Sequence, residues 1–188
     1  RYNCWRNYCC NEAWRLALKQ TETPTALVLT RQALPIIERE SFADTVERGG
    51  YVLADAEDPR LILIATGSEV QIAVAVREQL AAEGISARVV SMPCCEVFDA
   101  QDHSYKESVL PAGVPRLAVE AASPDYWRKY IGIDGEIVGL DHFGASAPAK
   151  VLFEKFGITT DAVVEAAKKV LLKRAEEPGL TSNYSELI

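Results

Sequence analysis

The sequence lacks the long apolar runs that mark membrane-spanning segments. None of its apolar stretches approaches the roughly 18 residues that a helix needs to cross a bilayer. The first residues also lack the charged, apolar and small-residue order of a signal peptide. The 20 lysines and arginines form no basic stripe, and the formal net charge is −7. We therefore expect a soluble, cytoplasmic protein that binds neither a membrane nor nucleic acid.

Sequence motifs for several common chemistries are also missing. No G-x-x-x-x-G-K-[ST] or G-x-G-x-x-G loop is present to hold phosphates, and no G-x-S-x-G turn surrounds a serine. The five cysteines lie in two clumps without the C-x₂-C spacing of zinc sites. The odd number favours free thiols in a reducing compartment over a disulfide framework, and we expect no metal site.

The sequence does contain a regular alternation of strand and helix patterns between residues 51 and 174. Four apolar runs typical of buried strands each precede a helical pattern, over residues 61–67, 86–92, 115–121 and 136–140. This order predicts right-handed crossovers and a parallel sheet. A shorter run over 49–55 predicts an antiparallel edge strand. The expected fold is a three-layer α/β/α sandwich with a mostly parallel five-stranded sheet.

Three segments flank this predicted domain. Residues 1–31 contain a helical pattern and then a strand-like run, and residues 32–50 have the proline, charge and Gly-Gly composition of a linker. Residues 175–188 have little periodicity and are expected to form a tail. Because the first residue is Arg1 rather than methionine, we expect a piece of a longer chain.

Polar residues follow the predicted strands at the sheet edge where open α/β proteins bind ligands. They are Ser68, Glu69, Ser123, Asp141 and His142. A serine, a histidine and a carboxylate on one rim are compatible with nucleophilic catalysis or with a small-ligand site. The alternative is structural: the serines cap helices, Asp141 bonds loop amides, and His142 lies at the surface.

Several stretches together resemble one family. PTALVLTRQALP, GGYVLAD, LILIATGSEVQIAVAV, ARVVSMPCCEVFDAQD, RLAVEAASPDYWRKYIG and GLDHFGASAPAKVLFEKFGIT occur in this order. Over residues 12–172 the chain resembles the C-terminal part of the transketolases. The resemblance implies that residues 1–31 are the end of the middle, pyrimidine-binding domain and that residues 51–174 are the C-terminal domain. The first ten residues depart from the family pattern.

The resemblance also implies a function for the parent protein. Transketolases transfer a two-carbon ketol unit from ketose phosphates to aldose phosphates, in the pentose phosphate pathway and the Calvin cycle. They are homodimers that use thiamine diphosphate and a divalent metal, Mg or Ca. The parts that hold this cofactor lie upstream, so we expect the chain alone to bind no cofactor and to be inactive, while it serves dimer packing. No catalytic residue is expected in it.

One residue is singled out by the resemblance. Arg31 follows the strand-like run of residues 26–30 and corresponds to the family's arginine that contacts the substrate phosphate. A guanidinium suits this role because its planar donors match phosphate bidentately. In a severed chain, we expect the strand before Arg31 to be either disordered or paired with a non-native neighbour.

Two alternatives remain at this point. The chain could be the equivalent domain of a 2-oxo acid dehydrogenase β subunit or of deoxyxylulose phosphate synthase, or a stand-alone regulatory module that binds a small ligand.

Overall fold

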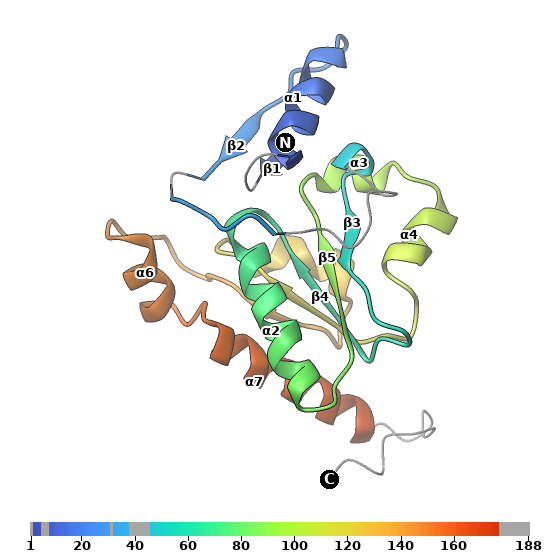
Figure 1. Cartoon of the computed structure of the whole chain (residues 1–188), viewed down its shortest axis with the longest axis vertical. Coiled ribbons are helices and arrows are strands. Elements are labelled where there is room, and N and C mark those ends of the chain that lie inside the picture. The colour runs from blue at the N-terminus through green and yellow to red at the C-terminus, as the bar shows by residue number, and fades with distance from the viewer. Residues whose placement is uncertain (1, 5–7, 31, 38–45, 177–188) are drawn as a thin grey trace.

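The computed structural model describes residues 2–4, 8–30, 32–37 and 46–176. Its centre is a five-stranded sheet of order β3-β5-β4-β6-β7 (Figure 1). The strands are β3 (Tyr51–Ala54), β4 (Leu61–Ala65), β5 (Ala87–Ser91), β6 (Arg116–Val119) and β7 (Glu136–Val138). All neighbours pair in parallel except β3, which runs antiparallel to β5 at one edge. The predicted sheet and its antiparallel edge strand are confirmed.

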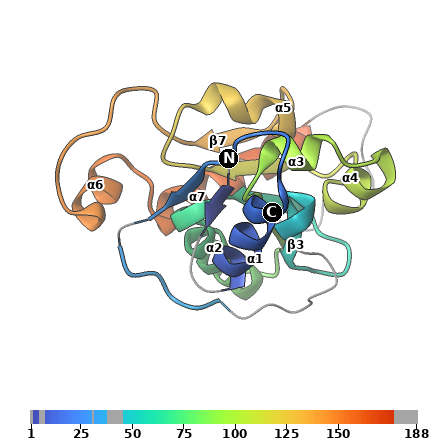
Figure 2. The same cartoon turned by 90° about the horizontal axis from the view of Figure 1, so that it is seen from above.

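Helices cover both faces of the sheet. On one face lie α2 (Val70–Ala82) and α7 (Thr160–Glu176). The other face is covered by α3 (Cys95–Asp99), α4 (His103–Val109), the 3₁₀ helix η3 (Pro124–Trp127) and α5 (Arg128–Ile131). Figure 2 shows α3, α4 and α5 on one side of the sheet and α2 on the other. The molecule is therefore the expected three-layer sandwich.

The central strand β4 explains why two separate cores form. All five of its residues are buried, because it lies between β5 and β6 and beneath helices on both faces. Side chains alternate across a strand. Accordingly, Leu61, Leu63 and Ala65 enter the core under α2 and α7, whereas Ile62 and Ile64 enter the core under α3 to α5.

Glycines fix two turns of this domain. Helix α2 ends before Gly84, whose φ of 77° is the left-handed conformation that favours glycine. Gly49 has a φ of 80°, and a Cβ there would lie 2.3 Å from the carbonyl oxygen of Cys94. The Gly-Gly pair assigned to the linker is therefore packed tightly against the start of α3.

Side-chain hydrogen bonds shape two helix starts. Before α2, the Ser68 hydroxyl donates to the Glu69 carboxylate, and the Gln71 amide donates to the carbonyl of Ser68. Helix α4 is capped by Asp102, whose carboxylate accepts from the backbone N–H of Tyr105 at 2.8 Å. This bond satisfies one of the backbone donors that the first turn of a helix leaves without a partner.

The N-terminal unit, comprising residues 2–4, 8–30 and 32–37, packs on this domain through helix α1 and through Leu34, which is buried in the core. Its elements are β1 (Tyr2–Cys4), α1 (Tyr8–Lys19) and β2 (Leu27–Leu29). Ala13 of α1 is buried in the core, and the Glu12 carboxylate accepts from the backbone N–H of Val46 at 3.2 Å. Val46 begins the 3₁₀ helix η1 (Val46–Arg48) and is itself fully buried. The end of the predicted linker is thus part of the core.

The strand before Arg31 is paired. Strand β2 runs parallel to β1, with Leu27 opposite Tyr2 and Leu29 opposite Cys4. Of the two outcomes expected for this strand, the structure shows pairing, and its partner lies in the stretch that departs from the family pattern.

Helix α6 (Ala149–Lys155) lies apart from the sheet (Figure 1) and buries none of its residues. The loop before it exposes Phe143 almost completely, at 98%. Within the described ranges, no helix combines the length and apolar character needed to cross a membrane.

Candidate functional site

The strand order places a ligand crevice between β4 and β6. From β4 the chain passes through α2 to β5 on one side, and it then returns across β4 to β6 on the other side. Open α/β sheets bind ligands where the strand order reverses in this way, outside the carboxyl ends of the strands. Here those ends are Thr66 after β4 and Glu120 after β6.

A cavity of about 320 Å³ opens beside this position, and we call it the rim pocket. Its volume is at the lower end of the range of small-molecule sites. It is lined by Thr66, Met92, Pro93, Cys95, Glu96, Glu120, Ala122, Ser123, Tyr126 and Trp127. The loops after β4, β5 and β6 and the end of η3 thus all contribute to it.

Thr66 is the most unusual residue of the rim pocket. Its backbone is extended, and it is only 4% exposed. Its hydroxyl has no hydrogen-bond partner within the described part of the chain. Buried polar groups in proteins are nearly always hydrogen-bonded, so this fully buried hydroxyl is an exception to the usual pattern.

Carboxylates and aromatic rings form the rest of the lining. Glu96 and Glu120 supply two negative charges, and the lining residues include no lysine, arginine or histidine. Trp127 is buried and contacts the ring of Tyr126 edge-on at 6.4 Å. The pocket is therefore acidic with an aromatic wall.

The Cys95 thiol is not a nucleophile at neutral pH. Burial raises its pKa to about 11, and only the thiolate attacks efficiently. Cys94 is also a free, buried cysteine, and burial raises its pKa as well.

Glu69 is a buried carboxyl next to the crevice. It is 4% exposed, and burial raises its pKa from 4.5 to about 6. Hydrogen bonds from the Ser68 hydroxyl, at 3.1 Å, and from backbone groups of Glu69 and Ala121 oppose this rise. Glu69 therefore connects the turn after β4 to the turn after β6.

The predicted rim residues do not come together as one site. Ser123 lines the rim pocket and precedes η3, but its side chain makes no capping hydrogen bond. Ser68 bonds only to Glu69 among the contacts resolved for its hydroxyl. Asp141 and His142 lie in the exposed loop after β7. The His142 ring stacks edge-on with Phe156, and its Nδ1 lies 2.8 Å from the carbonyl oxygen of Phe143. Within the described residues, this arrangement forms no serine, histidine and carboxylate relay.

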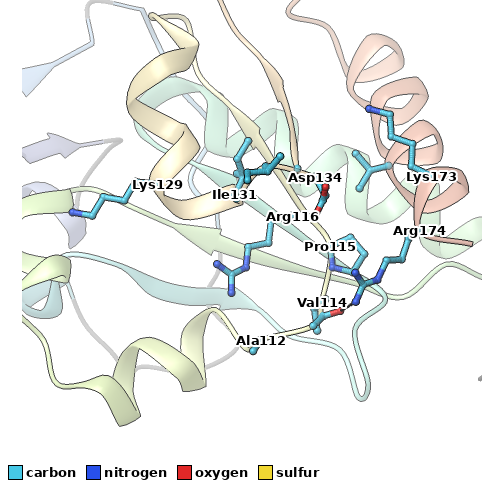
Figure 3. Close-up of a pocket in the computed structure, with 14 residues that line it drawn as sticks. Ala112, Val114, Pro115, Arg116, Lys129, Ile131, Asp134, Lys173 and Arg174 are labelled. Atoms are coloured by element: carbon cyan, nitrogen blue, oxygen red, sulfur yellow. Dashed lines mark hydrogen bonds between the residues drawn. The ribbon is translucent and has the colours of Figure 1, made fainter. Parts of the chain in front are cut away.

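A larger cavity of about 620 Å³ lies at the opposite, amino end of β6 (Figure 3). Its cations come from several elements, namely Arg116, Lys129, Lys173 and Arg174. Lys129 pairs with Asp99 at 2.5 Å, Lys173 lies 3.4 Å from Glu136, and Arg174 donates to the carbonyl of Gly113.

Arg116 is engaged most fully of these cations. Its guanidinium donates to the backbone carbonyls of Tyr130, Leu110 and Pro111 at 2.6, 2.7 and 3.1 Å. These carbonyls belong to the ends of α4 and α5, so Arg116 satisfies helix carbonyls that would otherwise lack partners. The larger cavity is therefore a structural region rather than an anion site.

Sequence reasoning identified Ser123 but missed Thr66, Glu96, Tyr126 and Trp127. The strand order was the missing information, because only the order shows that the ends of β4 and β6 are neighbours. The aromatic pair could have been found from Ser123-Pro124, which starts a helical turn directly over the rim. Arg31 lies outside the described residues.

Comparisons with known proteins agree with this fold. A family model described as "Transketolase-like TK C-terminal domain" matches residues 49–159. Transketolase 1 of Escherichia coli is 56% identical over 162 residues, which are 85% of this chain and 24% of that protein. Transketolase from Leishmania mexicana superposes with a TM-score of 0.85 at 38% identity, covering 98% of this chain and 27% of that one. Transketolase from Pichia stipitis, solved with sedoheptulose-7-phosphate, gives a TM-score of 0.85 at 39% identity, covering 97% and 27%. The chain thus spans about a quarter of the length of these relatives.

Proposed function

Because the chain belongs to the transketolase family and forms a C-terminal segment of such a protein, we propose that its parent transfers a two-carbon ketol unit from ketose phosphates to aldose phosphates. The observation that carries this proposal is the agreement between the family match over residues 49–159 and the superposition of nearly the whole chain. The reaction would serve the pentose phosphate pathway or, in a photosynthetic organism, the Calvin cycle. The free cysteines Cys94 and Cys95 support a cytoplasmic location.

The proposed parent uses thiamine diphosphate with Mg or Ca, but the residues described here do not fit these groups. No cluster of three histidine, cysteine or carboxylate residues that could hold a metal occurs within the described ranges. The rim pocket presents carboxylates, which repel a diphosphate, and the cations of the larger cavity are engaged with protein oxygens. We propose that other parts of the parent hold the cofactor and that the chain alone is inactive.

Substrate contact is assigned to Arg31. The preceding strand, β2, ends at Leu29 and carries Thr30 and Arg31 beyond it. A guanidinium stays charged at any working pH and binds phosphate through two parallel hydrogen bonds. The structure of the Pichia stipitis relative with sedoheptulose-7-phosphate supports a sugar phosphate as the substrate class.

The chain also contributes surfaces for assembly. Trp14 and Leu18, one turn apart on α1, are 54% and 79% exposed, and Ile36 and Phe143 are exposed as well. Large apolar side chains gathered on one element mark an interaction surface. We assign the face of α1 to contact with the upstream part of the parent and the loop around Phe143 to contact with a second subunit of a homodimer.

Ketol transfer by a reconstituted enzyme tests the role of Arg31. The upstream part of E. coli transketolase 1 is mixed with this chain, thiamine diphosphate and Mg²⁺. We expect Arg31→Gln to raise the KM for ketose phosphates about tenfold or more, because one charge-assisted bidentate contact is lost. Arg31→Lys should recover part of this loss.

Arg128→Gln is the matched control, because Arg128 is exposed on α5 and its side chain makes a long hydrogen bond, of 3.4 Å, to the carbonyl of Gly135. Its KM should equal that of the unaltered chain. An unchanged KM in Arg31→Gln would overturn the substrate contact, and a mixture without ketol transfer would overturn the proposed function.

A further inference from the structure

We propose that the peptide bond between Asp134 and Gly135 is a site of spontaneous modification, at which a succinimide ring forms and opens to isoaspartate. In isoaspartate the main chain runs through the side-chain carboxyl, which adds one methylene to the backbone directly before β7. This site is separate from ketol transfer and does not rest on the proposed function. The sequence contains no second Asp-Gly pair and no Asn-Gly pair.

The reaction needs only the groups of these two residues and water. The Gly135 nitrogen attacks Cγ of the protonated Asp134 carboxyl, a C–N bond forms, and the amide proton leaves with the carboxyl hydroxyl as water. A water molecule then adds to one of the two ring carbonyl carbons and breaks its bond to nitrogen. Addition at Cγ restores aspartate, whereas addition at the main-chain carbon gives isoaspartate. Because the reacting atoms belong to neighbouring residues, ring closure avoids the entropic cost of bringing two molecules together.

The Gly135 nitrogen is available for this attack. Glycine has no Cβ to hinder the approach of the carboxyl. Among the described residues, no backbone carbonyl accepts from the N–H of Gly135, and pairing of β7 with β6 begins only at Glu136. Most buried backbone N–H groups are held by such bonds. Gly135 also lines the larger cavity, which is wide enough to admit water.

The Asp134 carboxyl is free to reach this nitrogen. Asp134 is exposed between α5 and β7 and lines the same cavity (Figure 3). Its carboxylate has no hydrogen-bond or ion-pair partner within the described part of the chain. The lysines of this cavity pair with other carboxylates, Lys129 with Asp99 and Lys173 with Glu136. No partner therefore holds the Asp134 carboxyl away from the Gly135 nitrogen.

Other aspartates are less suited to ring closure. The three that precede alanines, namely Asp55, Asp99 and Asp161, each face a methyl group beside the attacking nitrogen. Asp55 is also held by Arg88 at 2.7 Å, and Asp99 by Lys129 at 2.5 Å. Asp161 lies in the first turn of α7, where the helix fixes the backbone. The modification is therefore selective for the Asp-Gly pair.

The surroundings of Gly135 leave no room for a longer backbone. A Cβ at this position would lie 2.6 Å from Cβ of Ile131 and 2.8 Å from the carbonyl oxygen of Arg116. The extra methylene must therefore be accommodated by β7, whose pairing starts at the next residue with Glu136 opposite Leu117. We expect modification to loosen this edge strand and to lower stability. The same contacts require glycine at this position, so a larger residue cannot replace the reactive pair.

Mass spectrometry on the folded 188-residue chain tests this site. The chain is kept at neutral pH in water enriched in oxygen-18 and is then digested with trypsin in ordinary water. Electron-transfer fragmentation distinguishes isoaspartate from aspartate in the peptide 130–150. We expect isoaspartate with one oxygen-18 atom at Asp134 but not at Asp141, which lies in the same peptide and precedes His142. Equal conversion of Asp141, or no conversion of Asp134 while the isolated peptide 130–150 converts by half, would overturn the proposal.

Variants separate the modification from its structural effect. Asp134→Glu should abolish the product, because its carboxyl would have to close a six-membered ring. Asp134→Asn should form isoaspartate several-fold faster, because an uncharged amide is attacked more readily than a carboxylate. Asp141→Glu is the matched control and should leave the product at Asp134 unchanged.

Urea unfolding measures the consequence for β7. The chain that has accumulated isoaspartate should unfold at a lower urea concentration than the fresh chain, whereas Asp134→Glu kept for the same time should not change. Equal product in Asp134→Glu and the unaltered chain would overturn the site. An unchanged midpoint in a chain that contains isoaspartate would overturn the effect on β7.

Discussion

The sheet domain, residues 46–176, and the N-terminal unit differ in how far their apolar side chains are buried. Every residue of β4 is buried, and both faces of the sheet are covered by helices. The N-terminal unit buries Ala13 and Leu34 but exposes Trp14, Leu18 and Leu29. Burial of a large apolar side chain contributes about 1.5–3 kcal/mol. The strands of the sheet domain are thus covered on both faces, whereas the N-terminal unit and the loop around Phe143 keep exposed apolar side chains.

The two regions should therefore contribute to different properties of the protein, namely stability and assembly. The sheet domain holds its own pocket and its own structural ion pairs, so its stability should depend on internal packing. The N-terminal unit should affect assembly with the upstream part of the parent much more than stability. Variants in each region can show whether the division holds.

The largest expected effect on stability comes from Gly49. A Cβ at this position would lie 2.3 Å from the Cys94 carbonyl oxygen and 2.4 Å from the backbone nitrogen of Phe98, and φ is 80°. We expect Gly49→Ala to lower the free energy of unfolding in urea by about 3 kcal/mol or more, because strain in the backbone adds to overpacking.

Gly113→Ala is the control for Gly49, since its φ is also 80° but its added Cβ would meet nothing within 4 Å. It should lower the free energy of unfolding by only about 1–2 kcal/mol. Equal losses in the two variants would show that packing around α3 is looser than described.

A smaller, pH-dependent effect is expected at Glu69. Its pKa in the folded chain is about 6 against an ordinary value of 4.5. The protonated form is therefore favoured by folding, so the added stability is present below pH 4.5 and is lost as pH rises through 6. The loss is about 2 kcal/mol, at about 1.4 kcal/mol per unit of pKa shift.

Chemical unfolding at several pH values checks this sign. Glu69→Gln cannot ionise, so its stability relative to the unaltered chain should rise by about 2 kcal/mol between pH 4 and pH 7. Glu78→Gln, at an exposed position, should show no such relative change. A constant difference between Glu69→Gln and the unaltered chain would contradict the raised pKa.

The sequence predicted the sheet well because its signal is local. The run LILIATG is long enough and apolar enough to indicate a fully buried strand. Gly84 and Gly157, both with positive φ, mark helix ends that glycine patterns predict. The antiparallel direction of β3 also agreed with its short length at the end of the predicted linker.

The site was less predictable because its parts are distant in the sequence. Thr66 and Tyr126 meet only through the strand order, and the unpartnered hydroxyl becomes evident only in three dimensions. His142 followed a strand as expected, but the chain leaves the sheet there toward α6, so His142 stacks on Phe156 rather than joining the rim. The role of Arg31 came from family resemblance, and it stays a prediction.

The division of roles between the sheet domain and the N-terminal unit is tested most directly by a titration. It measures the concentration of this chain that restores ketol transfer to the upstream part of E. coli transketolase 1. The account predicts that neither part is active alone and that the rate saturates as this chain is added. The double variant Trp14→Ser with Leu18→Ser should change the free energy of unfolding in urea by no more than about 0.5 kcal/mol but require about tenfold more chain. Full activity of the upstream part by itself, or unchanged restoration by the double variant, would contradict the account.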